Sequence, residues 1–424
     1  MLHMQLDDLP APVPVTVLSG FLGAGKTTVL NRLLGASDGR RIAVIVNDIG
    51  EVNIDADLLR RGALKHVEAE MVEMHNGCIC CTLRGDLLDE ITRLASLGFD
   101  HIVIESTGIG EPLAIAETFE FALEDGSTLG DVAAIDAMIT LVDGVGFLAE
   151  WKAGRSLAEV GQSLGPEDGR SITDLLVAQV EFANVLVISK TDLATADNLN
   201  ELEAILRVLN PEATIIRSVQ GNIPLTELLD TGAFDMEEAR RAPGWMATLR
   251  EDKLPETLEY GIATFVYRAR RPFHSERVWA WLNEPGQWDA VLRSKGFFWL
   301  CTRMDVVGAW SQAGGSAACE VAGTWFAATP MDSWPSDPEI LVEVNKTWVD
   351  PWGDRRQELV FIGQHLDRER ISASLDTCLL TDEELAEGED AWSHYPDPFP
   401  AWTPSEVADA SDEDGSTSDD EVAA

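Results

Sequence analysis

The sequence is poor in positive charge. Only seven of its 424 residues are lysine, and the 31 lysines and arginines together are outnumbered by 73 aspartates and glutamates, which gives a formal net charge of −42. Such a charge repels the phosphate backbone, so no nucleic-acid partner is expected. The acidic residues occur along the whole chain, and we interpret them as a solvated acidic surface rather than as one functional face.

Long apolar runs are also missing. No run of about 18 apolar residues occurs, which argues against a membrane-spanning helix. The first ten residues are polar and acidic, unlike the basic and then apolar start of a secretory signal. We therefore predict no membrane partner and a cytoplasmic location.

Cysteine is scarce but unevenly placed. Three of the six cysteines, Cys78, Cys80 and Cys81, lie within four residues, which is too close to connect distant parts of a fold. A cytosolic setting disfavours disulfides in any case, so a chemical role is favoured for this cluster. The other three are interpreted as buried packing residues.

The apolar pattern predicts an α/β fold with a mostly parallel sheet. Short β-branched runs alternate with amphipathic stretches from Val13 to Ile216, as in a sheet flanked by helices. Strands are expected at 13–18, 42–46, 101–105, 137–142, 185–189 and 214–216, and helices at 27–34, 87–97, 172–180 and 202–209.

Composition predicts four segments in the chain. Together with the motif G-x-x-x-x-G-K-[ST] at 20–27, it predicts a nucleotide-binding domain of the phosphate-loop (P-loop) NTPase type over 1–230. A linker is expected over 231–257, and a smaller α+β domain over 258–379 with strands at 261–268, 297–303, 321–327 and 358–362. Residues 380–424 are rich in Asp, Glu, Ser, Pro and Gly, so a disordered acidic tail is expected there. Twelve of the thirteen tryptophans lie from Trp245 onward and are interpreted as core or interface.

Residues 18–28 carry the pattern G-x-x-x-x-G-K-[ST] between a predicted strand and a predicted helix. The glycines let the backbone curl so that its N–H groups point at anionic oxygens, and the positive end of the helix adds to the attraction. Lys26 is expected to reach the outer phosphates and Thr27 to hold Mg²⁺ through its hydroxyl. The predicted nucleotide-binding residues here are Gly20, Gly23, Ala24, Gly25, Lys26, Thr27 and Thr28.

Two acidic segments follow the second and third predicted strands. The first contains three carboxylates, those of Asp48, Glu51 and Asp55. One interpretation is functional: they bind Mg²⁺ or position the attacking water. The other is a polar turn with helix-capping aspartates, and the pattern leaves both open. In the run from His101 to Gly108, the predicted strand ends in Glu105, which can order the Mg²⁺ shell. The loop that follows contains Gly108, whose backbone amide can sense the γ-phosphate.

Ser189-Lys190-Thr191-Asp192 follows the fifth predicted strand. Asp192 can accept the N1 and N2 hydrogens of guanine, which adenine does not supply, while the Lys190 stem packs along the base. This favours GTP over ATP, although the pattern usually begins with Asn. The alternative is an ordinary helix N-cap.

The cysteine cluster predicts a metal site. Closely spaced thiolates suit a soft or borderline ion such as Zn²⁺, which takes four ligands. Three cysteines leave one position for His75, Glu51 or water. An inert trio of cysteines and a redox switch built on low-pKa thiols are the alternatives.

These motifs resemble the CobW family of metal-handling GTPases, in the same order along the chain. The segments that carry the likeness are 20–28, 47–55, 77–81 and 105–108, together with 270–274, 293–299 and 357–363, which look like the CobW C-terminal domain of the zinc-responsive, YciC-like branch. The chain departs from that family at Ser189, at Gly110-Glu111-Pro112 and in lacking a His-rich stretch.

The resemblance implies a GTPase of low turnover that loads Zn²⁺, or Co²⁺ in some relatives, at Cys78, Cys80 and Cys81 and delivers it to a client apo-metalloprotein. Lys26, Asp48 and Glu105 are then the expected catalytic residues. A homo-oligomer is a further expectation. Two rivals stay open: a metal-sensing GTPase that regulates or assembles an enzyme without transferring metal, and a plain nucleotide-binding enzyme such as a kinase.

Overall fold

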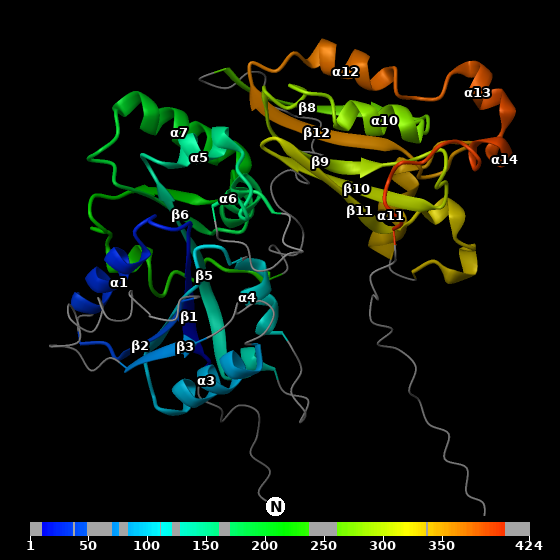
Figure 1. The fold of residues 1–424 in the computed structure, drawn as a ribbon. Coiled ribbons are helices and arrows are strands. Elements are labelled where there is room, and N and C mark those ends of the chain that lie inside the picture. Colours follow the sequence, from blue (N-terminus) through cyan, green and yellow to red (C-terminus); the bar gives the residue numbers. More distant parts are fainter. Residues whose placement is uncertain are drawn as a thin grey trace, which may run out of the picture.

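The computed structural model describes residues 11–36, 39–48, 70–75, 84–110, 112–120, 128–160, 170–236, 261–335 and 338–402. These residues form two domains, each built on its own sheet (Figure 1). The described part of the first domain ends at residue 236, and that of the second domain begins at residue 261. Among the described residues, no helix is long and apolar enough to cross a membrane.

The first domain contains a seven-stranded sheet in the order β3-β2-β4-β1-β5-β6-β7, in which every neighbouring pair is parallel. The strands are β1 (Val13–Ser19), β2 (Ile42–Asp48), β3 (Glu70–His75), β4 (His101–Glu105), β5 (Ala133–Asp143), β6 (Val185–Ser189) and β7 (Thr214–Arg217). All residues of β4 and β6 are buried, as expected for strands covered on both faces. The parallel α/β fold is confirmed, and β3 is an addition that the apolar pattern did not predict.

Helices cover both faces of this sheet (Figure 1). They are α1 (Lys26–Gly35), α3 (Arg84–Ser96), α4 (Pro112–Thr118), α5 (Phe147–Ala153), α6 (Ile172–Glu181) and α7 (Ala196–Leu209). One core cluster packs α1 against the sheet, a second packs α3 and α4, and a third packs α5, α6 and α7. Because all strands are parallel, their carboxyl ends lie at one edge, where ligand-binding loops of such sheets are found.

The second domain is α+β, as predicted, with a five-stranded antiparallel sheet in the order β11-β10-β9-β12-β8. Its strands are β8 (Ile262–Ala269), β9 (Val291–Phe298), β10 (Val306–Ala313), β11 (Ser316–Thr324) and β12 (Gln357–Gln364), and its longer helices are α10 (Ser275–Leu282), α11 (Pro338–Thr347) and α12 (Arg368–Asp376). Large aromatic side chains, including Trp281, Trp310 and Phe361, form its core. The strand expected at 297–303 was wrong, since the chain leaves the sheet after Phe298.

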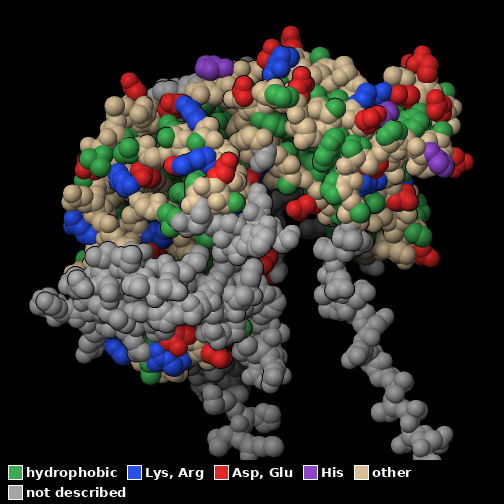
Figure 2. Space-filling view, viewed as in Figure 1, with side chains coloured by type: hydrophobic (Ala, Val, Ile, Leu, Met, Phe, Trp, Pro, Cys, Tyr) green, Lys and Arg blue, Asp and Glu red, His purple; other side chains and the backbone are tan. Residues whose placement is uncertain are grey.

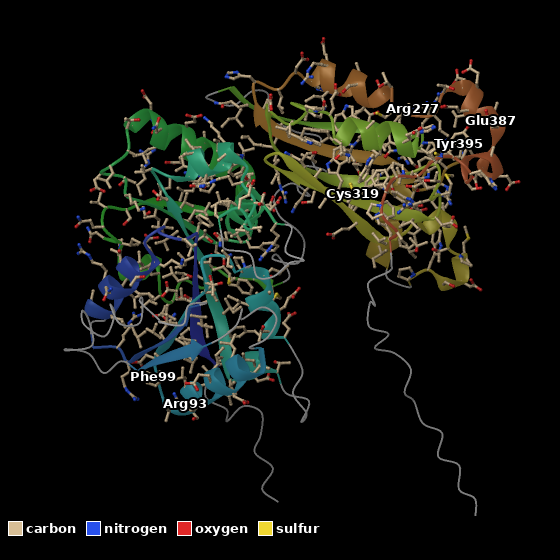
Figure 3. The ribbon with its side chains drawn as sticks, viewed as in Figure 1. Arg93, Phe99, Arg277, Cys319, Glu387 and Tyr395 are labelled. Atoms are coloured by element: carbon tan, nitrogen blue, oxygen red, sulfur yellow. The ribbon has the colours of Figure 1, made fainter. Side chains whose placement is uncertain are left out.

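The expectation of a disordered tail from residue 380 was wrong for residues 380–402. This segment forms α13 (Asp382–Glu387) and α14 (Glu389–Trp392) and returns to the second domain. Arg277 pairs with Glu384, and the Tyr395 hydroxyl donates to Glu387 at 2.7 Å (Figure 3). Arg303 pairs with Asp397 at 2.8 Å. Residues 403–424 lie outside the described residues.

Buried aromatic side chains explain why the acidic composition was misleading there. Trp392 is 2% exposed and its indole donates to the Glu384 carbonyl oxygen at 2.6 Å. We expect Trp392→Ala to lower the unfolding free energy of the second domain by about 3–5 kcal/mol, measured by chemical denaturation. Ser393→Ala, at the exposed neighbouring position, is the control. Equal stability of the two variants would contradict this packing.

The boundary of the first domain also differs from the expected one. Residues 231–236, expected in the linker, belong to the first domain. Backbone N–H groups of Thr231 and Gly232 donate to the Asp136 carboxylate, and Phe234 and Met236 pack against its core. Residues 237–260 are outside the described part of the chain.

Acidic side chains are scattered over the described surface of both domains in Figure 2, without gathering into one patch on this face. That distribution agrees with the interpretation of a generally solvated acidic surface. Basic side chains lie among them, and many are paired, for example Arg217 with Glu203 and Arg268 with Glu358.

Candidate functional site

The loop between β1 and α1 has the backbone shape that phosphate binding needs. Gly20, Gly23 and Gly25 all have positive φ angles, of 135°, 74° and 102°. A Cβ at Gly20 would lie 2.5 Å from the Leu141 carbonyl oxygen, so no larger residue fits at that position. Gly25 directly precedes the first residue of α1, and the N–H groups of the first helical turn therefore point toward the loop.

Lys26 and Thr27 lie in the first turn of α1, as predicted. The Lys26 side chain is 8% exposed, and its Nζ donates to the Gly20 carbonyl oxygen at 2.7 Å, so it is folded along its own loop. Thr27 is half-buried, and Thr28 is exposed. The amino group is thereby held beside the backbone curl of residues 20–25.

Glu105 ends β4 beside the start of the phosphate loop. It is in register with Leu18 of β1 and with Val46 of β2, and its side chain is 2% exposed. The following loop approaches the phosphate loop closely, because a Cβ at Gly108 would lie 2.9 Å from the Leu22 amide nitrogen. The structure thus brings Glu105, Gly108 and the phosphate loop together.

Ser189 holds β6 against the phosphate loop. Its hydroxyl lies 2.7 Å from the Ala24 carbonyl oxygen and 3.2 Å from that of Val142, and it donates to one of them at a time. Ser189, which stands where the guanine-recognition pattern usually has Asn, therefore makes a direct contact with the phosphate loop. Gly25 has a φ of 102°, so the left-handed backbone conformation is what favours glycine there, and an added Cβ would be in ordinary contact with the Ser189 Cβ at 3.9 Å.

We expect Ser189→Ala to weaken guanine-nucleotide binding by roughly tenfold, because losing one buried hydrogen bond costs about 1–1.5 kcal/mol. Titration with a fluorescent GTP analogue measures the change. Ser393→Ala removes an exposed serine hydroxyl far along the chain and serves as the control. An unchanged dissociation constant would show that the contact does not stabilise the binding form of the loop.

The predicted base-recognition residues follow β6. Lys190 has a φ of 53°, and its ammonium group lies 2.6 Å from Asp143 Oδ2 at the end of β5. Burial raises the pKa of the Asp143 carboxyl, but hydrogen bonds from Lys190 and from two backbone N–H groups outweigh this and hold that pKa below its ordinary value. Asp192 is exposed, as a residue that reads a base edge must be.

Two parts of this subsite were not predicted from the sequence. Asp143 follows an apolar strand directly, a position that could have indicated a functional carboxylate. The loop after β7 contributes Ser218, whose carbonyl oxygen accepts from the Thr191 hydroxyl at 3.0 Å. Gly221 of the same loop packs against Thr28, since a Cβ added to Gly221 would lie 3.2 Å from the Thr28 carbonyl oxygen. No sequence pattern pointed to that loop.

The predicted metal ligands lie partly outside the described residues. Cys78, Cys80, Cys81 and Glu51 belong to that outside part. Asp48 and His75 are described in their backbone only, and they are directly paired in the register of β2 and β3. Among the described residues, no group of three or more His, Cys, Asp or Glu side chains is placed to hold a metal ion.

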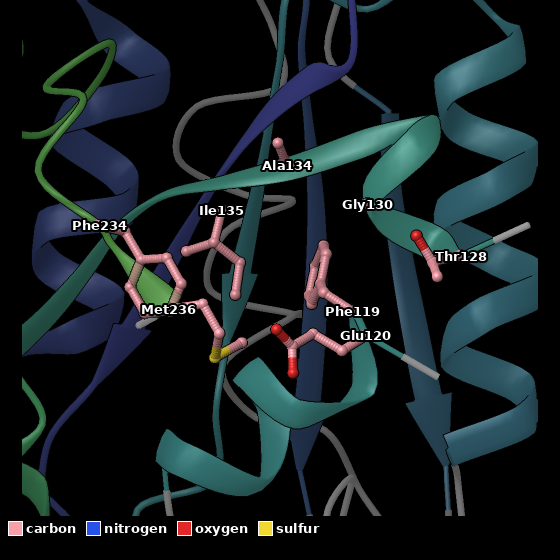
Figure 4. Close-up of a pocket in the computed structure, with 8 residues that line it drawn as sticks. All are labelled: Phe119, Glu120, Thr128, Gly130, Ala134, Ile135, Phe234 and Met236. Atoms are coloured by element: carbon pink, nitrogen blue, oxygen red, sulfur yellow. The ribbon is translucent and has the colours of Figure 1, made fainter. Parts of the chain in front are cut away.

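A shallow pocket lies at the opposite edge of the first sheet, near the amino end of β5 (Figure 4). It is lined by Phe119, Glu120, Thr128, Gly130, Ala134, Ile135, Phe234 and Met236. Of the described residues that line it, Glu120 alone carries a carboxylate, and none is a histidine, cysteine, lysine or arginine. Its lining therefore suits neither a triphosphate nor a thiophilic metal.

A glycine-rich loop between a strand and a helix of a parallel sheet, with a buried glutamate at the end of the neighbouring strand, is the arrangement of a P-loop nucleotide-binding domain. A model of the CobW/HypB/UreG nucleotide-binding domain matches residues 14–217, and a model of the cobalamin synthesis protein cobW C-terminal domain matches residues 262–379. The chain belongs to the CobW family, and it hydrolyses GTP.

Relatives in this family carry names that refer to zinc. "Zinc-regulated GTPase metalloprotein activator 1" of Dictyostelium discoideum is 45% identical over 402 residues, which cover 91% of this chain and 84% of the relative. "Zinc chaperone CobW" of Sinorhizobium sp is 32% identical over 231 residues, which cover 52% of this chain and 63% of the relative.

Among solved structures, the Zn(II)-bound YjiA GTPase from E. coli is 22% identical and aligns over 87% of this chain and 99% of its own, with a TM-score of 0.36. At that TM-score, the similarity assigns no role to any residue of this chain.

Proposed function

We propose that this GTPase binds Zn²⁺ at Cys78, Cys80 and Cys81 and delivers it to a client apo-metalloprotein, with GTP hydrolysis releasing the ion. The observation that carries the proposal is the register of β2 and β3, which pairs Asp48 with His75 at the sheet edge that also holds the phosphate loop. The zinc-related names of the relatives support the choice of ion.

The spacing between β1 and β3 supports a coupling between the nucleotide and the cysteine cluster through the loops that follow these strands. Three strand-to-strand steps separate β1 from β3, which is roughly 14–15 Å at the usual strand spacing. Cys78 follows the end of β3 by only three residues. A nucleotide that orders the loops after β2 and β4 is therefore near enough to change the thiolate site, which is the form that many GTPase switches take.

The oxygen groups beside the phosphate loop fit Mg²⁺. Thr27 offers a hydroxyl in the first turn of α1 and Glu105 a buried carboxylate, and hard oxygen donors of this kind suit that ion. When bound, Mg²⁺ would neutralise charge on the phosphate oxygens. Lys26 would contact the same phosphates, Gly108 would sense the γ-phosphate, and Asp48 remains the proposed residue for positioning the attacking water.

Zinc affinity in two nucleotide states tests the coupling. We expect Zn²⁺ to bind about 100-fold more tightly with a non-hydrolysable GTP analogue than with GDP, which corresponds to roughly 2.7 kcal/mol. Competition with a chromophoric chelator measures both constants. Equal constants would remove the coupling of hydrolysis to release.

A second measurement separates delivery from sensing. A chaperone activates an apo-client in the presence of GTP and a competing chelator, whereas a metal-sensing regulator does not. The identity of the ion as Zn²⁺ rather than Co²⁺, the client, a homo-oligomeric state and a cytoplasmic location all stay predictions.

A further inference from the structure

The last turn of α6 lies between the loop after β4 and the second domain. Gln179 and Glu181, two residues apart, point to opposite sides of the helix because successive residues are rotated by about 100°. Gln179 faces the loop and Glu181 faces the sheet of the second domain. Both side chains are buried, at 1% and 8% residue exposure.

Gln179 bonds directly to the loop after β4 and is linked to the phosphate loop through Thr140. Its side-chain amide donates to the carbonyl oxygens of Gly108 and Gly110 at 3.2 and 3.3 Å. Its backbone carbonyl oxygen accepts from the Thr140 hydroxyl at 2.7 Å, and Thr140 in turn lies 2.7 Å from the hydroxyl of Ser19 at the start of the phosphate loop.

The loop after β4 is also held at Ile109, the residue between Gly108 and Gly110. Arg170, just before α6, donates to the Ile109 carbonyl oxygen at 3.4 Å, so three consecutive carbonyl groups accept from this part of the chain. The Ile109 side chain is 3% exposed and packs in the cluster formed by α5, α6 and α7. The backbone conformation of residues 108–110 thus depends on where α6 lies.

Glu181 fastens α6 to β9. Its carboxylate, 3% exposed, lies 3.1 Å from Arg293 Nε and 2.9 Å from Lys295 Nζ. Burial alone would raise the pKa of Glu181, but the two cations outweigh it and keep that pKa below its ordinary value. The contact is close along the helix, since a Cβ at Gly314 would lie 2.9 Å from the Thr173 hydroxyl oxygen.

We propose that Gln179 is a positioning residue for GTP hydrolysis, and that the second domain supports it through Glu181 and β9. Gln179 holds the carbonyl groups of Gly108 and Gly110, and this restrains the backbone of Gly108, whose N–H is the proposed sensor of the γ-phosphate. Arg293 and Lys295 hold the last turn of α6 that carries Gln179. The hydrolysis rate therefore depends on the contact between the two domains.

Gln179→Met in the full-length chain is the first test. It keeps the side-chain volume but removes both donated hydrogen bonds, and we expect the single-turnover rate of preloaded GTP to fall on the order of 10- to 100-fold. The dissociation constant for a GTP analogue should change less than about threefold, since positioning alters the rate rather than binding. Rates are normalised to bound nucleotide, so only folded protein is counted.

Gln357→Met is the matched control. Gln357 is fully buried in the second domain, and its amide likewise donates to two carbonyl oxygens, those of Arg271 and Trp299. Because Gln357 Oε1 also accepts from the Trp299 backbone N–H at 3.0 Å, this variant should lose at least as much stability as Gln179→Met while keeping the parental hydrolysis rate. A Gln179→Met rate equal to that of the control would overturn the positioning role.

A double-mutant cycle with Lys295→Met tests the link between the domains. Removing Lys295 leaves Glu181 paired with Arg293, so the fold is expected to survive. We expect Lys295→Met alone to lower the hydrolysis rate roughly three- to tenfold. Added to Gln179→Met, it should lower the rate no further. Multiplicative effects of the two substitutions, or an unchanged rate for Lys295→Met alone, would overturn the transmission through α6.

Discussion

Replacing Lys26 with alanine is expected to lower the rate of GTP hydrolysis by at least about 100-fold, because its ammonium group is the positive charge that we propose contacts the outer phosphates. The substitution should leave the fold intact. Lys26 donates to a carbonyl oxygen of its own loop, and the helix that follows is anchored by Val29, Leu30, Leu33 and Leu34. The measurement is phosphate release at saturating GTP.

Lys152→Ala provides the control for Lys26. Lys152 is an exposed lysine near the end of α5, and its removal changes the net charge of the chain by the same amount. We expect the control to hydrolyse GTP at the parental rate. If Lys26→Ala were within about threefold of this control, the assignment of Lys26 to the phosphates would be wrong.

The second large effect is expected at the cysteine cluster. Replacing Cys78, Cys80 and Cys81 together with serine should weaken Zn²⁺ binding about a thousandfold or more, since thiolates provide most of the binding free energy at such sites. Chelator competition measures the affinity. Substitution with Co²⁺ adds an optical test, because the thiolate-to-cobalt charge-transfer band should be present in the parent and absent in the variant.

Cys319→Ser is the matched control for the cysteine cluster. Cys319 is half-buried in β11, and burial raises its thiol pKa to about 12, so it stays protonated and is a poor metal ligand. The control should bind Zn²⁺ as the parent does. Tight Zn²⁺ binding by the triple serine variant would place the metal elsewhere and would remove the basis for metal delivery.

The sheet of the first domain was predictable because its central strands are almost entirely apolar. The predicted bounds of β4 and β6 match the observed ones, since five consecutive residues are buried in each. The edge strand β3 was missed. Its sequence is Glu-Met-Val-Glu-Met-His, with a single β-branched residue, and its strand character comes from pairing with β2 rather than from its own composition.

The second domain was harder to predict because small and polar residues form part of its sheet. β10 contains Gly308, Ser311 and Gln312, which have little strand preference, and it was not predicted. The aromatic run after Gly296 suggested a strand that continues to residue 303, yet β9 ends at Phe298. In the acidic segment 380–402, order depends on a few buried aromatic side chains such as Trp392 and Phe399.

The nucleotide site was predicted where the contacts are local in sequence. The phosphate loop is one continuous motif, so its residue types define its backbone shape. Contacts between distant segments were not accessible in the same way. Ser189 meets Ala24 across 165 residues, and Gln179 meets Gly108 across 71, so neither contact follows from a local pattern.

The distribution of tryptophan makes the junction of α5 and α6 observable in solution. Trp151 on α5 is the only tryptophan before residue 245; it is 4% exposed, and its carbonyl oxygen accepts from the Thr173 hydroxyl on α6. In protein labelled with fluorotryptophan, a single ¹⁹F resonance would therefore come from the first domain. Its chemical shift gives a direct record of how this helix pair responds to each nucleotide, separate from the twelve resonances contributed by the remainder of the chain.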